Sequence, residues 1–241
     1  VARTSDAQSG PSGSVLVNTG DSDASAAGAV RVEIGASGSG QGQRLSLRSG
    51  HANGHEAGGH VSVRSGGSAL ELTGSSGDIA IMSASASQSG ELAVGTGTAM
   101  EGSSGSISVS VGNSIMEQAG AVTVSGGFGM RGSDVTVNAG ASDSAVEGGA
   151  VFVASGSSLA GQSGTLQIAS AQAVGSGGVI IASGSASSLA SGKISISTGS
   201  SVGSDAGDIN LIVGSGASNA GGDLVLNAGD AMGMESTGGN V

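Results

Sequence analysis

The sequence predicts an all-β protein, a β-solenoid (β-helix) built from short strands of the form aliphatic–x–aliphatic. Three observations predict this fold: the triplet recurs along the whole chain, glycines flank it at fixed positions, and only two aromatic residues are present. Alternation of apolar with other residues is typical of a strand with one buried face. Repeats of this kind bury their apolar faces by stacking on their neighbours, which gives a solenoid.

The triplets number 16 in the 241 residues, and both aliphatic positions always hold Val, Ile or Leu. Glycine stands two residues before the first aliphatic in 13 of the 16 triplets, and five residues after it in 13 of the 16. A flexible Gly/Ser-rich linker has no reason to keep such a register, so the pattern indicates a folded repeat. The pairs are Val15/Val17, Val30/Val32, Leu45/Leu47, Val61/Val63, Leu70/Leu72, Ile79/Ile81, Leu92/Val94, Ile107/Val109, Val122/Val124, Val135/Val137, Val151/Val153, Leu166/Ile168, Val179/Ile181, Ile194/Ile196, Ile209/Leu211 and Leu224/Leu226.

Most triplets begin 13 to 16 residues apart, but two consecutive intervals, on either side of Leu70, are only nine residues long. A closed nine-residue coil would enclose almost no core, whereas a short connection can cross between two sheets about 10 Å apart. We therefore expect about 15 residues per strand unit and two units per rung, on two opposed sheets. One unit per rung, with an insertion or kink at residues 61–79, is the alternative. Residues 1–241 would form one uncapped repeat domain, part of a longer array or filament.

Two further sets of apolar residues have expected places in this solenoid. The middle residue of a triplet should point outward, and the large apolar ones are Leu16, Phe152, Ile180 and Val225. They are either scattered exposed residues or a lateral assembly face, to which Leu16, Phe152 and Ile180 would contribute from one sheet. Val241 would open a further triplet at the assembly interface. An apolar residue eight positions after a first aliphatic would plug the other end of the rung: Met100, Ile115, Met130, Leu159, Val174, Val202 and Met232.

The charge of the chain is acidic and uneven. The formal net charge is −11 and the isoelectric point is about 4.3, which argues against nucleic acid or an anionic membrane as a partner. Residues 1–64 sum to zero with five arginines, whereas residues 65–241 carry the whole −11. This asymmetry predicts head-to-tail self-association, although solubility alone would also explain the acids. No apolar run is long enough to predict a membrane span.

No motif predicts a metal site, a cofactor or catalysis. His51, His55 and His60 are the only candidate metal ligands, but they lie in a glycine-rich connection (HANGHEAGGH) and are expected to be solvated. The aspartate pairs Asp21/Asp23 and Asp205/Asp208 stand outside any G-G-x-G-x-D calcium repeat. The segment GSSVG at 199–203 matches G-x-S-x-G, yet no histidine follows it. We therefore expect no enzyme, no catalytic residue and no cofactor.

Several units resemble the Ser/Gly/Ala-rich repeats of predicted surface or secreted proteins of stramenopiles (diatoms, brown algae, oomycetes). They are GGAVFVASGSSLAGQSG, SGKISISTGSSVGSDAG and SGSISVSVGNSIMEQAG. This resemblance covers residues 13–241 and implies an extracellular, fibrous protein without known catalytic residues. GGDLVLNAGD and GDINLIVGSG are similar to the haemagglutinin-type repeats of bacterial adhesins, whose periods are longer and more regular.

These expectations together describe a structural protein, the subunit of an extracellular filament or surface appendage. Its partner would be itself, joined end to end through the exposed edges of the rungs. O-linked glycans are possible on the serine-rich connections. The alternatives are an adhesin that presents a loop such as 51–60 to a carbohydrate or partner, and an ice-binding solenoid. The ice-binding solenoid is a distant third, because only Thr123 and Thr136 place threonine at an outward position.

Overall fold

The computed structural model of the chain describes residues 2–8, 10–68, 74–144, 146–217, 220–231 and 237–240. Within these ranges the chain forms neither helix nor strand. The predicted all-β solenoid is therefore wrong for the described residues, because no sheet joins one triplet to another. The Leu70/Leu72 pair and Met232 lie outside the described residues.

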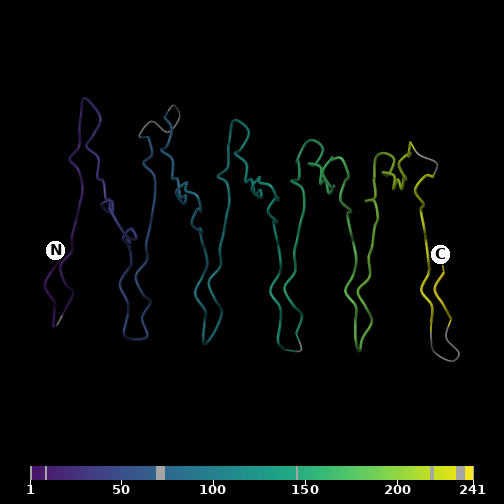
Figure 1. Cartoon of the computed structure of the whole chain (residues 1–241), viewed down its shortest axis with the longest axis horizontal. Coiled ribbons are helices and arrows are strands. Elements are labelled where there is room, and N and C mark those ends of the chain that lie inside the picture. The colour runs from purple at the N-terminus through teal and green to yellow at the C-terminus, as the bar shows by residue number, and fades with distance from the viewer. Residues whose placement is uncertain are drawn as a thin grey trace. The chain divides into compact units, whose positions relative to one another are not determined.

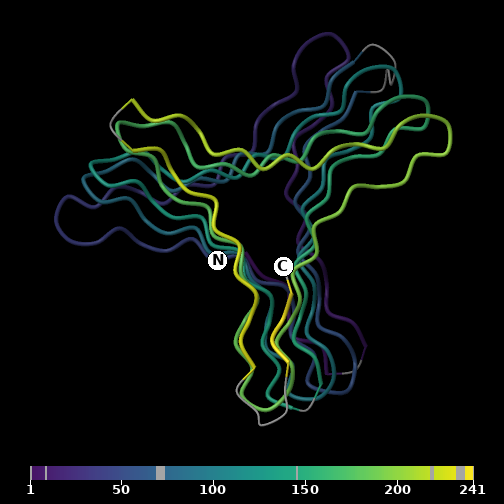
Figure 2. The same ribbon diagram turned by 90° about the vertical axis from the view of Figure 1, so that its right-hand side faces the viewer.

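The chain divides into two units, Val1–Val122 and Thr123–Val241. Each unit is a succession of loops that run outward and return, as the ribbon shows (Figure 1). The bends at the outer ends of the loops, such as 23–25, 38–40 and 187–189, fall between consecutive triplets. Within each unit the loops point in three directions in turn, so that every third loop extends the same way (Figure 2). That the two units form a single repeat domain stays a prediction.

Each loop narrows at its base, where the two glycine positions that flank the triplets meet. In five loops the backbone N–H two residues before the first aliphatic of one triplet donates to the carbonyl oxygen five residues after the first aliphatic of an earlier triplet, as Gly59 does to Gly50 at 3.0 Å. The other four pairs, at 2.9 Å, are Gly77 to Gly66, Gly149 to Gly140, Gly164 to Gly156 and Gly239 to Gly229. We call this closure the neck of the loop.

Close approach accounts for glycine at some of the positions that directly precede a triplet. A Cβ atom on Gly59 would lie 3.2 Å from the nitrogen of Gly50 and 3.3 Å from the Cβ of Ser49. A Cβ on Gly222 would lie 3.0 Å from Cγ1 of Val213, at the same place in another loop. Such distances are shorter than ordinary packing allows, so a side chain here would force the neck open.

One exception to the glycine pattern closes its loop with a second bond besides the backbone bond of the neck. Ser133 takes the place of glycine before the triplet at Val135, and its Oγ accepts a hydrogen bond of 2.6 Å from the N–H of Gly127. The N–H of Ser133 in turn donates to the carbonyl oxygen of Gly127 at 3.3 Å. The serine hydroxyl therefore adds a side-chain bond to the backbone bond that closes the other necks.

The necks also overturn the prediction of two units per rung on two opposed sheets. A connection whose ends meet at a neck does not carry the chain across a gap of about 10 Å between sheets. Gly77 N–H donates to the carbonyl oxygen of Gly66, so the described residues on the two sides of the Leu70/Leu72 pair meet at a neck. The chain resumes its direction after three units rather than two (Figure 2), which is 46 residues from Val15 to Val61.

No side chain in the described ranges is buried. The first aliphatic of each described triplet is 50–60% exposed and the second 65–79%. The whole chain exposes 24260 Å², whereas a folded monomer of this mass exposes about 9,400 Å². The residues predicted to plug the rungs are fully exposed wherever they are described, for example Met130 and Val174, so that prediction is wrong.

Candidate functional site

The histidine-bearing loop has a neck with two hydrogen bonds. Besides the bond from Gly59 N–H to Gly50, the Oγ of Ser49 donates to the carbonyl oxygen of Gly59 at 2.8 Å. Ser49 is half-buried there, as are Thr4 and Thr19 at the corresponding position of two other loops. Ala52, next to His51, is half-buried as well, while the histidines themselves are exposed.

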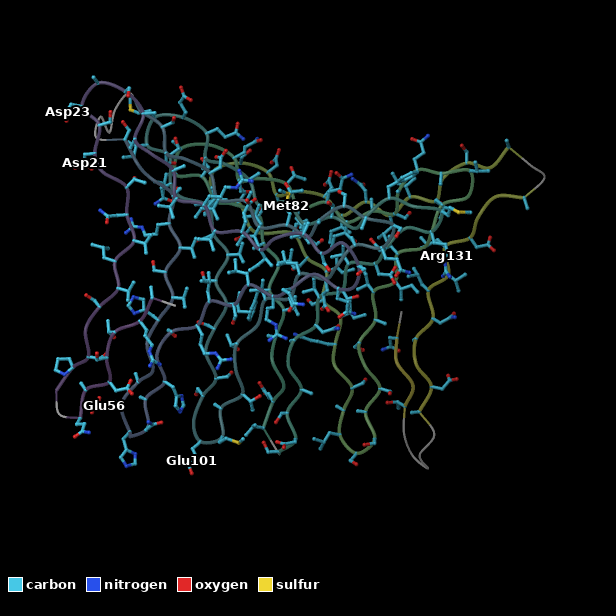
Figure 3. All side chains as sticks on the ribbon, turned by 60° about the vertical axis from the view of Figure 1, so that its left-hand side comes forward. Asp21, Asp23, Glu56, Met82, Glu101 and Arg131 are labelled. Atoms are coloured by element: carbon cyan, nitrogen blue, oxygen red, sulfur yellow. The ribbon has the colours of Figure 1, made fainter. Side chains whose placement is uncertain are left out.

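The structure does not assemble the histidines into a metal site. Glu56 lies near the outer end of the loop (Figure 3), and His60 lies just beyond the neck, next to the triplet at Val61. Nowhere in the part of the chain that the structure describes do three or more His, Asp or Glu side chains lie close enough to hold an ion. His51 and His55 are therefore separate exposed groups on one closed loop, and His60 is exposed just beyond its neck.

Substitution of Gly59 by alanine is expected to open this neck. The new Cβ would meet Gly50 and Ser49 at 3.2–3.3 Å, so the backbone bond, worth about 0.5–1.5 kcal/mol, would be lost. Gly50→Ala is the matched control, because a Cβ at Gly50 meets nothing within 4 Å. Amide hydrogen exchange of residue 59 is the measurement. Equal exchange rates in the two variants would contradict the role of the neck.

The carboxylates are also dispersed. Asp21 and Asp23 lie near the outer end of one loop of the first unit (Figure 3), where Ser25 N–H donates to the Oγ of Ser22 at 3.2 Å. That bond holds the turn of the loop. The one ion pair among the described residues joins Arg31 to Glu33, with side chains 78% and 61% exposed. An exposed pair of this kind contributes little stability, so these charges set the surface potential rather than the fold.

The predicted assembly residues are exposed, but the sheet that would have placed them together is absent. Leu16 is 81% exposed, Phe152 93% and Ile180 90%, while Val241 lies outside the described residues.

The aliphatic pairs form the largest set of exposed apolar side chains in the described part of the chain. They recur at nearly constant spacing, and nothing in the described part of the same chain buries them. Few contacts join residues far apart in the sequence. The arrangement offers a repeated apolar surface to another molecule, and the sequence analysis missed this because it assumed that each chain covers its own pairs.

A second feature that the sequence analysis missed is the loop Gly126–Ser133. Phe128 and Met130 are completely exposed in it, and Arg131 follows them. The signal was present in the sequence: GGFGMRGS is a connection that contains a phenylalanine and a basic residue, in a chain with two phenylalanines and seven basic residues. Because Met130 was predicted to fill the end of a rung, this loop was not predicted to be an exposed feature.

Comparison with known proteins adds no relative. The chain matches no family model, and neither a curated protein nor a solved structure is similar to it. Among the described residues, no helix of the length and apolarity needed to span a membrane is found.

Proposed function

We propose that this chain is a structural protein, a subunit that assembles with copies of itself into an extracellular filament or surface appendage. The observation that carries the proposal is the half-exposed aliphatic pair in every described triplet. Full burial of one such side chain contributes about 1.5–3 kcal/mol, so covering the exposed half contributes about 1 kcal/mol. Burial of about ten such groups would offset the cost of association, about 4–15 kcal/mol.

A second copy is the occupant that fits this surface. The pairs of one chain recur at the same spacing as those of any other copy, so many pairs can be covered in one encounter. An unrelated partner would need the same period. The exposed serine-rich loops leave hydroxyl groups available for O-linked sugars, and the resemblance to stramenopile surface proteins favours an extracellular location. The proposal assigns no catalytic residue and no cofactor.

Electron microscopy of the purified chain at neutral pH, over a range of concentrations, tests this function. Continuous filaments whose amount rises with concentration are the expected result. Discrete particles that do not change on concentration would contradict it. Such particles would favour the adhesin, and a glycan screen with the loop between Gly50 and Gly59 would then follow.

A further inference from the structure

Arg131 differs from the other basic residues in its place along the repeat. The bend at 129–131 puts it at the outer end of the loop Gly126–Ser133, in the second unit (Figure 3). Both of the large side chains before it, Phe128 and Met130, are completely exposed. The hydrogen bonds between Gly127 and Ser133 hold the base of the loop, so the segment Phe128–Gly132 projects from a fixed point.

The remaining six basic residues all lie at triplets or necks. Arg31 is the middle residue of its triplet and pairs with Glu33. Arg44 and Lys193 directly precede a first aliphatic, and Arg48 and Arg64 directly follow a second one. Arg3 adjoins Thr4, whose Cγ2 would lie 3.2 Å from a Cβ on Gly13, at the neck of the first loop. Association through the aliphatic pairs would therefore cover the surroundings of these residues and leave Arg131 uncovered.

We propose that the loop Gly126–Ser133 is a proteolytic processing site, cut between Arg131 and Gly132 by a protease of trypsin-like specificity, and that it is the one basic site still accessible in the assembled protein. The proposal rests on the proposed function, because the selectivity arises when copies cover the triplets. Exposed loop ends with small residues are the preferred positions of nicking in proteins, and glycines flank this arginine closely on both sides.

The chemistry is hydrolysis of one peptide bond. The arginine side chain fills the acidic specificity pocket of the protease, and the carbonyl carbon of Arg131 is attacked. The bond from that carbon to the nitrogen of Gly132 breaks, and water supplies the oxygen of the new Arg131 carboxylate and a proton for the new Gly132 amine. The cut lies nine residues after Val122, so it separates most of one unit from most of the other.

Trypsin digestion of pelleted filaments and of dilute, unassociated chain tests the inference, with the fragments identified by intact mass. The filaments are expected to give two fragments, 1–131 and 132–241, whereas the dilute chain is cut at several basic residues. Arg131→Gln should remove the cut in filaments and leave their amount unchanged. Early cleavage of filaments after Arg48, Arg64 or Lys193, or resistance at Arg131, would overturn the inference.

Two matched substitutions test the rule rather than the single residue. Val174→Arg puts a basic residue in another exposed loop and should create a second cut in filaments. Ala182→Arg puts one directly after the Val179/Ile181 pair, in the place that Arg64 occupies after Val63, and should create none. If no material pellets in any variant, the proposed function fails. If filaments pellet and both new arginines are cut equally, only the inference fails.

Discussion

Replacement of Ile194 by aspartate is expected to abolish filament formation at concentrations where the unchanged chain assembles. In a single chain Ile194 is 51% exposed and Ile196 is 72% exposed, and we expect association to cover the rest of both. The substitution removes that apolar contribution and forces a carboxylate into an apolar contact, which costs several kcal/mol. Since 1.4 kcal/mol is a factor of ten, the concentration needed for assembly should rise at least about tenfold.

Ser195→Asp is the control for this prediction, because it adds the same charge at the middle position of the same triplet. Its side chain lies on the opposite face from the two isoleucines if the segment alternates, so assembly should change little. Sedimentation of both variants over a series of concentrations gives the comparison. If Ser195→Asp were as harmful as Ile194→Asp, net charge rather than the aliphatic pairs would control assembly.

Added salt is expected to promote assembly strongly. Copies that each carry a charge of −11 repel one another, and association through apolar groups has to overcome that repulsion. The screening length falls from about 30 Å at 0.01 M to about 8 Å at 0.15 M, so most of the repulsion between copies should disappear over this range. Light scattering at fixed protein concentration should rise steeply between these two salt concentrations.

The sign of the salt effect also separates two ways of joining copies. Head-to-tail attraction between the neutral, arginine-bearing residues 1–64 and the acidic remainder would weaken as salt screens it. Dissolution of filaments by 0.15 M salt would therefore contradict association through the aliphatic pairs and favour the charged contact. Because most of each copy carries a net charge of the same sign, we expect salt to promote assembly rather than to dissolve the filaments.

The repeated triplets and glycines of this molecule could be predicted from the sequence. The contacts that they make in the structure could not. The regular glycines before and after each triplet were visible in the sequence, but their meeting at the necks was not. The alternation of apolar and other residues indicates which residues share a face of one segment. It does not indicate which residues nine positions apart are in contact, as Gly50 and Gly59 are. Whether a sheet forms depends on bonds between passes of the chain, which a pattern within one pass does not specify.

For the candidate site, too, some features could be predicted from the sequence and others could not. The histidines were predicted to be solvated, and they are exposed like nearly all of the described residues. The exposure of Met130 was predicted wrongly, because an apolar residue at a regular offset was taken to be core. The hydrogen bond from Gly127 to the Ser133 hydroxyl was not predicted, because the substitution of serine for glycine at this position has meaning only once the neck itself is known.

Amide hydrogen exchange of the same chain in two states, dilute and pelleted, tests most directly whether other copies cover the aliphatic pairs. In the dilute state we expect the triplet amides to exchange nearly as fast as in an unfolded peptide, since no sheet or core protects those that are described. In the pelleted state they should be protected, while residues 128–132 stay fast. Protection of the triplets in a chain that sediments as a monomer would contradict the account, because that chain would then bury its own pairs.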